Sequence, residues 1–220
     1  MDKGQQELLR RVASVIGHDL RNPLAVINNS TYFVRAKLGT KSVDPKIEKH
    51  LKIIESEVSR ADGLIADMLV YARPYEPASE TVLFDPLVVE AVDSYVAPEG
   101  GVVDLKLGAK GAAAKLDGAA FSDALKRLLD NAFAAQEGKG RIKVATSEGK
   151  DGLSAAVIDS GNGVDPKIKN VLYEAFMTTK PKGLGLGLSL ARKYMEGNGG
   201  AVSHVTGPKG STFRLTVPKA

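Results

Sequence analysis

The sequence contains no cysteine and no tryptophan, and aromatic residues make up only 5% of its 220 residues. Without cysteine the chain has no disulfide, no thiolate-ligated zinc or iron–sulfur site, and no thiol nucleophile. With so few aromatic residues, any core must be built from Leu, Ile, Val and Ala. These absences exclude disulfide scaffolds and cysteine enzymes, and they are compatible with a reducing compartment.

Long apolar runs and a strong charge of one sign are also missing. No stretch approaches the ~18 consecutive apolar residues of a membrane span, and the first residues lack the apolar region of a signal peptide. The net charge is only +4, from 30 Lys and Arg against 26 Asp and Glu. Nonspecific nucleic-acid binding needs a concentrated positive field, which this chain lacks. We therefore expect neither nucleic acid nor membrane as a partner, and a cytoplasmic protein or the soluble part of a longer one.

The first seventy or so residues have the apolar periodicity of two long helices. Residues 39–42 interrupt the pattern, and Asp44 and Pro45 restart it as an N-cap and a first helical residue. The second helix carries a heptad seam: Ile47, Leu51, Ile54, Val58, Ala61, Ile65 and Met68. Because a two-helix hairpin cannot bury such a seam alone, we predict a homodimer that forms a four-helix bundle.

The chain changes character after a linker at residues 73–77. Helical spacing recurs at 87–96 and 121–135. Five segments rich in β-branched residues and bounded by Gly or Pro are predicted strands: 102–107, 141–146, 153–158, 201–205 and 212–217. Helices mixed with strands favour a two-layer α/β sandwich. The sequence thus predicts an α+β chain of two domains, a helical hairpin over residues 1–75 and a sandwich over residues 76–220.

A histidine in the first predicted helix has a neighbourhood suited to nucleophilic chemistry. His18 and Asn22 are one turn apart on the same face, and Asp19 lies beside them. At ~100° per residue, His18 is about 200° around the helix from Ile16 of the seam, so it faces away from the core. The Asp19 carboxylate can keep one ring nitrogen of His18 protonated while the other ring nitrogen acts as the nucleophile. Pro23 interrupts the helical hydrogen bonds and predicts a bend of the helix near His18. Taken alone, the motif also fits a solvated surface histidine.

The run DSGNG at residues 159–163 follows a predicted strand. Gly161 and Gly163 allow close approach of a flat ligand, and Asp159 can accept a hydrogen bond from an exocyclic amine. The alternative is a plain turn into a helix that starts at residues 165–166.

A second glycine-rich run, GLGLGLS at residues 183–189, opens a predicted helix. Free N–H groups at a helix start, approached through glycines, form a phosphate cradle. The run is neither a Walker P-loop nor a dinucleotide fingerprint. Candidate ligands for the phosphates are Thr179, Lys180, Gly183, Gly185, Gly187 and Leu188.

Asn131 lies beside the apolar face of the predicted helix over residues 121–135. A polar amide in that position is either a satisfied buried group or a ligand for a hard cation such as Mg²⁺.

Together and in this order, these elements resemble the two-component sensor histidine kinases over roughly residues 5–218. Asn131 is similar to the second asparagine of the family's N box. The other boxes are matched as follows: the H box by HDLRNPL at 18–24, the G1 box by 159–163, the F box by 173–176 and the G2 box by 183–187. The run FMTTKP at 176–181 resembles the short ATP lid of nitrogen-regulation sensors.

The resemblance implies a dimerisation and phosphotransfer hairpin followed by a Bergerat-type ATP-binding domain of the Hsp90-like class. It implies ATP and Mg²⁺ as cofactors, with Asn131 as the Mg²⁺ ligand. Asp159 would hold the adenine amine, and Lys180 with the glycine loop would hold the phosphates. His18 would accept the γ-phosphoryl group, with Asp19 as its base or orienting group.

The implied partner is the receiver domain of a response regulator, which takes the phosphoryl group onto an aspartate. Asn22 matches the polar residue that positions water when such kinases dephosphorylate that partner.

The sequence departs from the family pattern in three places. Arg127 stands four residues before Asn131, where the family usually has asparagine or glutamate, and a cation there would repel Mg²⁺. Either Arg127 turns to solvent or to a phosphate, or the binding of metal and ATP is impaired. Residues 134–135 are alanines where a lysine is common, and Ala175 replaces the F-box proline. Arg127 sustains a second hypothesis, a phosphotransfer scaffold with a degenerate nucleotide-binding domain. A third, an ATP-driven conformational clamp, is disfavoured by the histidine-bearing hairpin.

Overall fold

The computed structural model describes residues 3–39, 44–180 and 183–220, and only the backbone of residues 3–12 and 14–16. The chain divides into two compact units, Met1–Pro74 and Tyr75–Ala220. Each unit has its own set of buried residues. In the described part of the chain, no helix combines the length and the apolar character that a membrane crossing requires.

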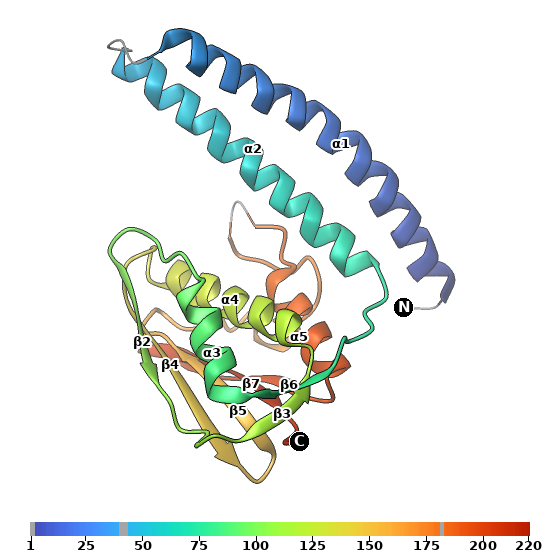
Figure 1. Ribbon diagram of the computed structural model, residues 1–220, viewed down its shortest axis with the longest axis vertical. Coiled ribbons are helices and arrows are strands. Elements are labelled where there is room, and N and C mark those ends of the chain that lie inside the picture. The colour runs from blue at the N-terminus through green and yellow to red at the C-terminus, as the bar shows by residue number, and fades with distance from the viewer. Residues whose placement is uncertain (1–2, 40–43, 181–182) are drawn as a thin grey trace. The chain divides into compact units, whose positions relative to one another are not determined.

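The first unit is a hairpin of two long helices, α1 (Lys3–Leu38) and α2 (Pro45–Ala72), seen at the blue end of the chain in Figure 1. Pro23 lies inside α1. As predicted, Asp44 caps α2 by accepting a hydrogen bond from the Lys46 backbone N–H at 2.7 Å, and Pro45 is the first helical residue. Of the predicted interruption at 39–42, only Gly39 belongs to the described residues.

The hairpin leaves much of its apolar surface uncovered. Among its described side chains, Leu51 and Ile65 are buried members of the seam, whereas Ile47 and Ile54 remain exposed. Ion pairs join the two helices: Arg35 contacts Glu55 at 3.0 Å, and Arg21 contacts Asp62 at 3.0 Å. The prediction that two helices cannot bury this seam alone agrees with these exposures.

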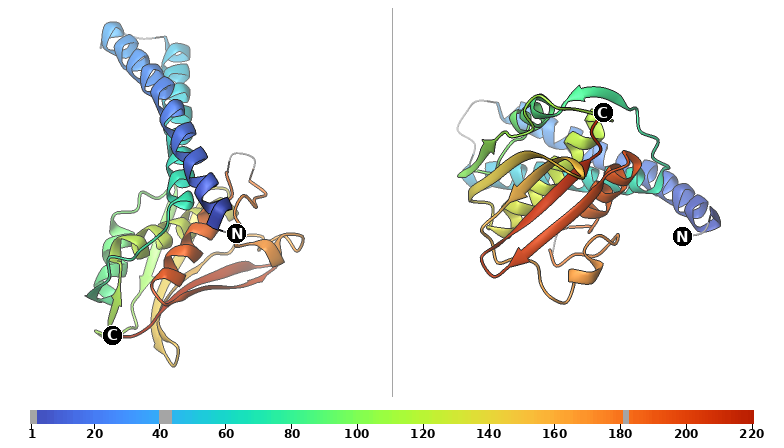
Figure 2. Two further views of the ribbon diagram at one scale, coloured as in Figure 1. Left: turned by 90° about the vertical axis from the view of Figure 1, so that its right-hand side faces the viewer. Right: turned by 90° about the horizontal axis from the view of Figure 1, so that it is seen from below.

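The second unit is a sandwich of one mixed sheet and one helical layer. The five-stranded sheet has the order β2-β4-β5-β7-β6, in which β2 and β4 are parallel and the other pairs antiparallel. Its strands are β2 (Gly101–Lys106), β4 (Gly140–Gly149), β5 (Gly152–Ile158), β6 (Ala201–Gly207) and β7 (Gly210–Val217). The helices α3 (Phe84–Asp93), α4 (Gly118–Ala135) and α5 (Gly187–Gly197) cover one face of this sheet (Figures 1 and 2).

The core lies between these two layers. Strand β7 buries every second residue, and β5 is almost wholly buried, as expected for a central strand. On the helical side, the rings of Phe84 and Phe121 meet edge to face with centroids 5.3 Å apart. The predicted fold class, a helical hairpin followed by a two-layer α/β sandwich, is confirmed.

Several predicted details differ from the structure. A second, two-stranded sheet pairs β1 (Glu80–Leu83) with β3 (Ala113–Leu116), and neither strand was predicted. Both are only four residues long, too short for a periodicity signal. Helix α3 begins at Phe84 rather than at residue 87. The prediction of a helix starting at residues 165–166 is wrong, because only a short 3₁₀ turn, Lys169–Val171, follows there.

Candidate functional site

His18 lies on the exposed face of α1, with 75% of its side chain accessible. Its Nδ1 lies 3.2 Å from Oδ1 of Asp19, so the carboxylate can hold the Nδ1 proton and leave Nε2 as the nucleophilic nitrogen. Asn22 follows one helical turn later and is also exposed. The structure therefore places the three residues predicted for phosphotransfer chemistry together on an accessible surface of the hairpin.

Asp159 is the first residue after β5 and is 94% removed from solvent, with 6% of its surface exposed. Its Oδ1 accepts hydrogen bonds from the backbone N–H groups of Gly161 at 2.9 Å and Ser211 at 3.2 Å. The Asp159 backbone N–H in turn donates to the Ser211 carbonyl at 2.9 Å. Because both side-chain bonds end at Oδ1, Oδ2 of this fixed carboxylate is the atom suited to an exocyclic amine.

The two glycines after Asp159 have no room for a side chain. A Cβ on Gly161 would lie 2.5 Å from the Ala135 carbonyl oxygen at the end of α4. Gly163 has a φ of +75°, and a Cβ there would lie 2.4 Å from the Gly207 carbonyl oxygen. The turn therefore packs backbone to backbone between the end of α4 and the end of β6, and its close contacts are with protein atoms. The approach of a planar base to Gly161 and Gly163, called the base cradle below, stays a prediction.

The second glycine run joins the lid to α5. Gly185 has a φ of +72°, and a Cβ on it would lie 2.7 Å from the backbone nitrogen of Met177. Its carbonyl accepts the Phe176 N–H at 3.1 Å, and Phe176 itself adopts a left-handed φ of 67°. Gly187 begins α5, whose first turn has no side-chain cap, so its N–H groups are available to an anion. Leu188 follows in that turn.

Lys180 extends from the lid to α4 and donates from Nζ to Oδ1 of Asn131 at 2.5 Å. Although the residue as a whole is exposed, its ammonium group lies among protein atoms, and this burial lowers the pKa of Lys180 while the charge of Asp130 opposes the shift. Burial also raises the pKa of Asp130, which accepts a hydrogen bond from the Tyr95 hydroxyl at 2.8 Å. The structure thus brings together Asn131 and Lys180, two of the residues predicted for the nucleotide site.

The remaining lid candidates are more peripheral. Thr179 and Gly183 are exposed, and the Thr178 hydroxyl accepts the Lys180 backbone N–H at 3.0 Å. Pro181, the last residue of the predicted lid, and Lys182 after it lie outside the described residues.

Arg127 lies one turn before Asn131 and is held close to the helix. Its Nε donates to Oδ2 of Asp123 at 2.9 Å, and only 15% of its side chain is exposed. A protein-held Mg²⁺ does not fit these donors: Asn131 supplies one amide oxygen, that oxygen already accepts from an ammonium group, and a second cation lies one turn away. In the part of the chain that the structure describes, no three His, Asp or Glu side chains gather in a metal-binding group.

Sequence reasoning missed several residues that support the site. Ser211 fixes Asp159 from 52 positions away, through the pairing of β5 with β7. Asp123 fixes Arg127, a contact that the i,i+4 spacing of opposite charges could have suggested. Near the lid, the Tyr173 hydroxyl lies 2.9 Å from Nδ1 of His204, and no sequence signal pointed to that pair.

Two family descriptions match this chain. Residues 8–76 match the "His Kinase A (phospho-acceptor) domain", which contains His18. Residues 116–220 match the "Histidine kinase-, DNA gyrase B-, and HSP90-like ATPase", which contains Asn131, Asp159 and both glycine runs.

Curated relatives agree with these matches. The chain is 27% identical over 92% of its length to the "Signal transduction histidine-protein kinase AtoS" of Escherichia coli, of which it covers 34%. It is 28% identical over 95% of its length to the "Nitrogen regulation protein NtrY" of Azorhizobium caulinodans, of which it covers 29%. The chain thus spans about a third of the length of these relatives.

Solved structures show the same fold. Full-length ShkA in complex with AMPPNP superposes with a TM-score of 0.77 at 20% identity, over 96% of this chain and 46% of that one. The histidine kinase ThkA in complex with the response regulator protein TrrA superposes with a TM-score of 0.69 at 21% identity, over 99% of this chain and 64% of that one. The chain therefore belongs to the histidine kinases and carries their catalytic core, a phospho-acceptor domain followed by an ATPase domain.

Proposed function

We propose that this core phosphorylates itself on His18 with ATP and passes the phosphoryl group to an aspartate of a response regulator. The observation that carries the proposal is the coexistence, in one chain, of the exposed His18–Asp19 pair and the buried, backbone-held Asp159 beside its glycine cradle. The first supplies a nucleophile, and the second supplies the means to bind a nucleotide.

Phosphoryl transfer requires positioning and charge neutralisation more than covalent chemistry by the protein. The Nε2 lone pair of His18 attacks the γ-phosphorus of ATP, and the bond to the bridging oxygen breaks to release ADP. The Nδ1 proton, hydrogen-bonded to Asp19 in the free protein, moves toward that carboxylate as the ring gains positive charge. Asp19 is thus proposed to fix the tautomer and to accept the proton.

The proposed nucleotide site runs along α4. The adenine amine donates to Asp159, with Gly161 and Gly163 allowing the base to lie against backbone. The phosphates lie toward Lys180 and the uncapped first turn of α5. No step above depends on the predicted role of Asn131 as a Mg²⁺ ligand, because a protein-held ion does not fit the donors around it.

The hairpin is proposed to dimerise. Its exposed apolar residues include Ile27, Val34, Ile47 and Ile54, more than a solitary two-helix unit leaves in water without cost. A second hairpin would bury these residues in a four-helix bundle. In this proposal residues 1–75 form the dimerisation and phosphotransfer domain, and residues 76–220 form the ATP-binding domain.

A further role is proposed for Asn22 when a phosphorylated receiver domain is bound. Its amide lies on the exposed surface one turn after His18, where it can orient a water molecule toward an aspartyl phosphate. If so, Asn22→Ala slows dephosphorylation of the receiver at least about tenfold, the size expected for losing one orienting group, and leaves labelling of His18 intact.

Incubation of the purified chain with γ-labelled ATP and Mg²⁺ tests the main proposal. We expect a label on the protein that survives base and is lost in acid, because phosphohistidine is acid-labile. His18→Gln and Asp159→Asn should both abolish it. The matched control is His50→Gln, since His50 is also an exposed helical histidine of the same unit.

Two outcomes would contradict this function. Label that persists in His18→Gln would assign the phosphoryl group to another residue. A folded dimer that takes no label from ATP, yet accepts a phosphoryl group from a phosphorylated receiver domain, would favour the phosphotransfer scaffold, for which the Arg127–Asp123 pair is the specific observation.

A further inference from the structure

One face of α4 carries a line of four residues at i,i+4 spacing: Asp123, Arg127, Asn131 and Ala135. None of the four belongs to the buried face of the helix. The Ala135 carbonyl packs against Gly161 of the predicted base cradle, and Asn131 accepts the lid lysine, Lys180. The line therefore leads from the base site to the phosphate site and continues to Arg127.

Distances along the helix agree with this order. At 1.5 Å of rise per residue, Arg127 lies ~6 Å beyond Asn131 and ~12 Å beyond Ala135. A nucleotide whose base rests on Gly161 and whose phosphates reach Asn131 therefore directs its terminal phosphates toward Arg127. The guanidinium group suits this role, because its planar donors match phosphate oxygens in pairs.

The position that would repel a metal ion therefore attracts phosphate. We infer that Arg127 is a phosphate-binding residue, which leaves Asp123 and binds the phosphates of ATP when the nucleotide enters. Together with Lys180 it neutralises the negative charge of the phosphates, a task that a Mg²⁺ ion held by this helix would otherwise perform. The inference rests on the proposed binding of ATP at Asp159 and goes beyond it in assigning the phosphate ligand.

In the free protein, Asp123 is one resting partner of Arg127. It is more exposed than Arg127, with 41% of its side chain accessible against 15%, so water can solvate its carboxylate when the arginine turns away. Lys180 already lies within hydrogen-bond distance of Asn131 and needs no such exchange. The two cations thus approach the phosphates from the helix and from the lid.

Calorimetric titration with ATP, in Mg²⁺ and separately in excess EDTA, tests the inference without measuring catalysis. The unmodified chain is expected to bind ATP in EDTA within about threefold of its affinity in Mg²⁺. Arg127→Asn should lose at least about tenfold in EDTA, the loss typical of a deleted charge-assisted hydrogen bond, and regain part of it in Mg²⁺. Arg127→Lys should retain most of the binding.

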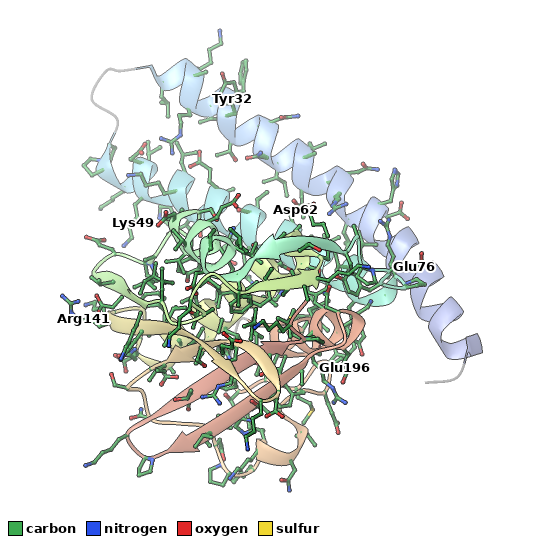
Figure 3. The ribbon with its side chains drawn as sticks, turned by 60° about the horizontal axis from the view of Figure 1, so that its bottom comes forward. Tyr32, Lys49, Asp62, Glu76, Arg141 and Glu196 are labelled. Carbon is green, nitrogen blue, oxygen red and sulfur yellow. The ribbon has the colours of Figure 1, made fainter. Side chains whose placement is uncertain are left out.

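Arg141→Gln is the matched control, because Arg141 is also paired with an aspartate: its guanidinium lies 2.8 Å from the Asp104 carboxylate. The Arg141 side chain projects outward from the sheet (Figure 3). The ATP affinity of this variant should not change. Circular dichroism and thermal unfolding of each variant separate lost binding from lost folding.

If Arg127→Asn binds ATP in EDTA as tightly as the unmodified chain, the inference is wrong. It is also wrong if chelation abolishes binding to the unmodified chain. Asp159→Asn distinguishes failure of the proposed ATP binding from failure of the proposed role of Arg127. If that variant loses ATP under both conditions while Arg127→Asn loses nothing, nucleotide binding stands and only the role of Arg127 fails. If the unmodified chain binds no ATP at all, both fail.

Discussion

The side-chain amide of Asn198 donates a hydrogen bond of 3.1 Å to the hydroxyl of Tyr75, although the two residues are 123 positions apart. The same hydroxyl donates to Oδ2 of Asp117 at 3.1 Å, and the Tyr75 ring meets Tyr194 edge to face at 5.0 Å. Asp117 caps α4, and Asn198 ends α5. The first residue after the helical unit is therefore fastened to the ends of two helices of the ATPase unit.

Tyr75→Phe should destabilise the ATPase unit by ~1–2 kcal/mol, because it removes the hydroxyl that serves both hydrogen bonds but keeps the ring. Tyr75→Ala should cost more, since it also removes the ring beside Tyr194 and Gly197. Denaturant unfolding of the full chain measures both effects. Tyr32→Phe, at an exposed position of α1 (Figure 3), should leave stability unchanged; an equal loss there would show that the network contributes nothing.

His204 should make the stability of the ATPase unit dependent on pH. Burial, with the nearby charge of Lys169, lowers the pKa of His204 below its usual 6.5. The folded protein then binds this proton more weakly than the unfolded chain, so the free energy of unfolding falls as the pH drops below about 6.5. Unfolding measured between pH 8 and roughly pH 5 should show this decline.

The decline should be smaller in His204→Gln and unchanged in His50→Gln. Nε2 of His204 is a buried polar atom without a hydrogen-bond partner in the described structure, so glutamine also tests whether that orphaned atom costs stability. A decline of the same size in His204→Gln would assign the pH dependence to other groups.

Gly161→Ala should weaken ATP binding more than about tenfold and lower the melting temperature, because its Cβ would lie 2.5 Å from a backbone oxygen that cannot easily move. Gly207→Ala is the control, since a Cβ there meets no atom within 4 Å. Calorimetry with ATP and thermal unfolding give the two readouts. Unaltered binding in Gly161→Ala would mean that the base lies elsewhere.

Ile54→Glu should dissociate the proposed dimer, because a charge in the bundle seam has no partner and must be desolvated. The dissociation constant, measured by analytical ultracentrifugation, should rise at least about tenfold. Lys49→Glu, on another face of α2 and directed outward from it in Figure 3, should leave the dimer intact. A dimer that tolerates Ile54→Glu would place the interface on other residues.

Sequence reasoning was reliable where a local rule determines the structure. The seam from Ile47 to Met68 and the Asp44–Pro45 start predicted α2, because helical spacing and capping depend on neighbouring residues. The glycines at 161, 163 and 185 were predicted to let a ligand approach the backbone, which stays a prediction; the structure shows that a Cβ on each would lie within 3 Å of another backbone atom of the protein. These features follow from short stretches of chain.

Contacts between distant segments could not be predicted in this way. Ser211 holds Asp159 only because β5 and β7 are neighbours in the sheet, and strand order is not encoded in either strand alone. The strands β1 and β3 depend on each other, so neither has a signal by itself. At residues 165–166, the cap chemistry is present, since Asp165 accepts from the Lys167 N–H at 2.9 Å, and Ile168, Val171 and Leu172 have helical spacing. The chain nevertheless forms only the short turn Lys169–Val171, so the tertiary context overrides the local signal here.

The hydrogen bond between the Phe176 N–H and the Gly185 carbonyl closes the lid segment at its base. Residues 177–184 therefore begin and end at one point of the framework, so their number can change without displacing β5 or α5. Loop-closure entropy rises slowly with length, by only about 0.6 kcal/mol for a doubling. Insertions between Phe176 and Gly185 should consequently cost little stability. Lid length can therefore vary as such enzymes diverge.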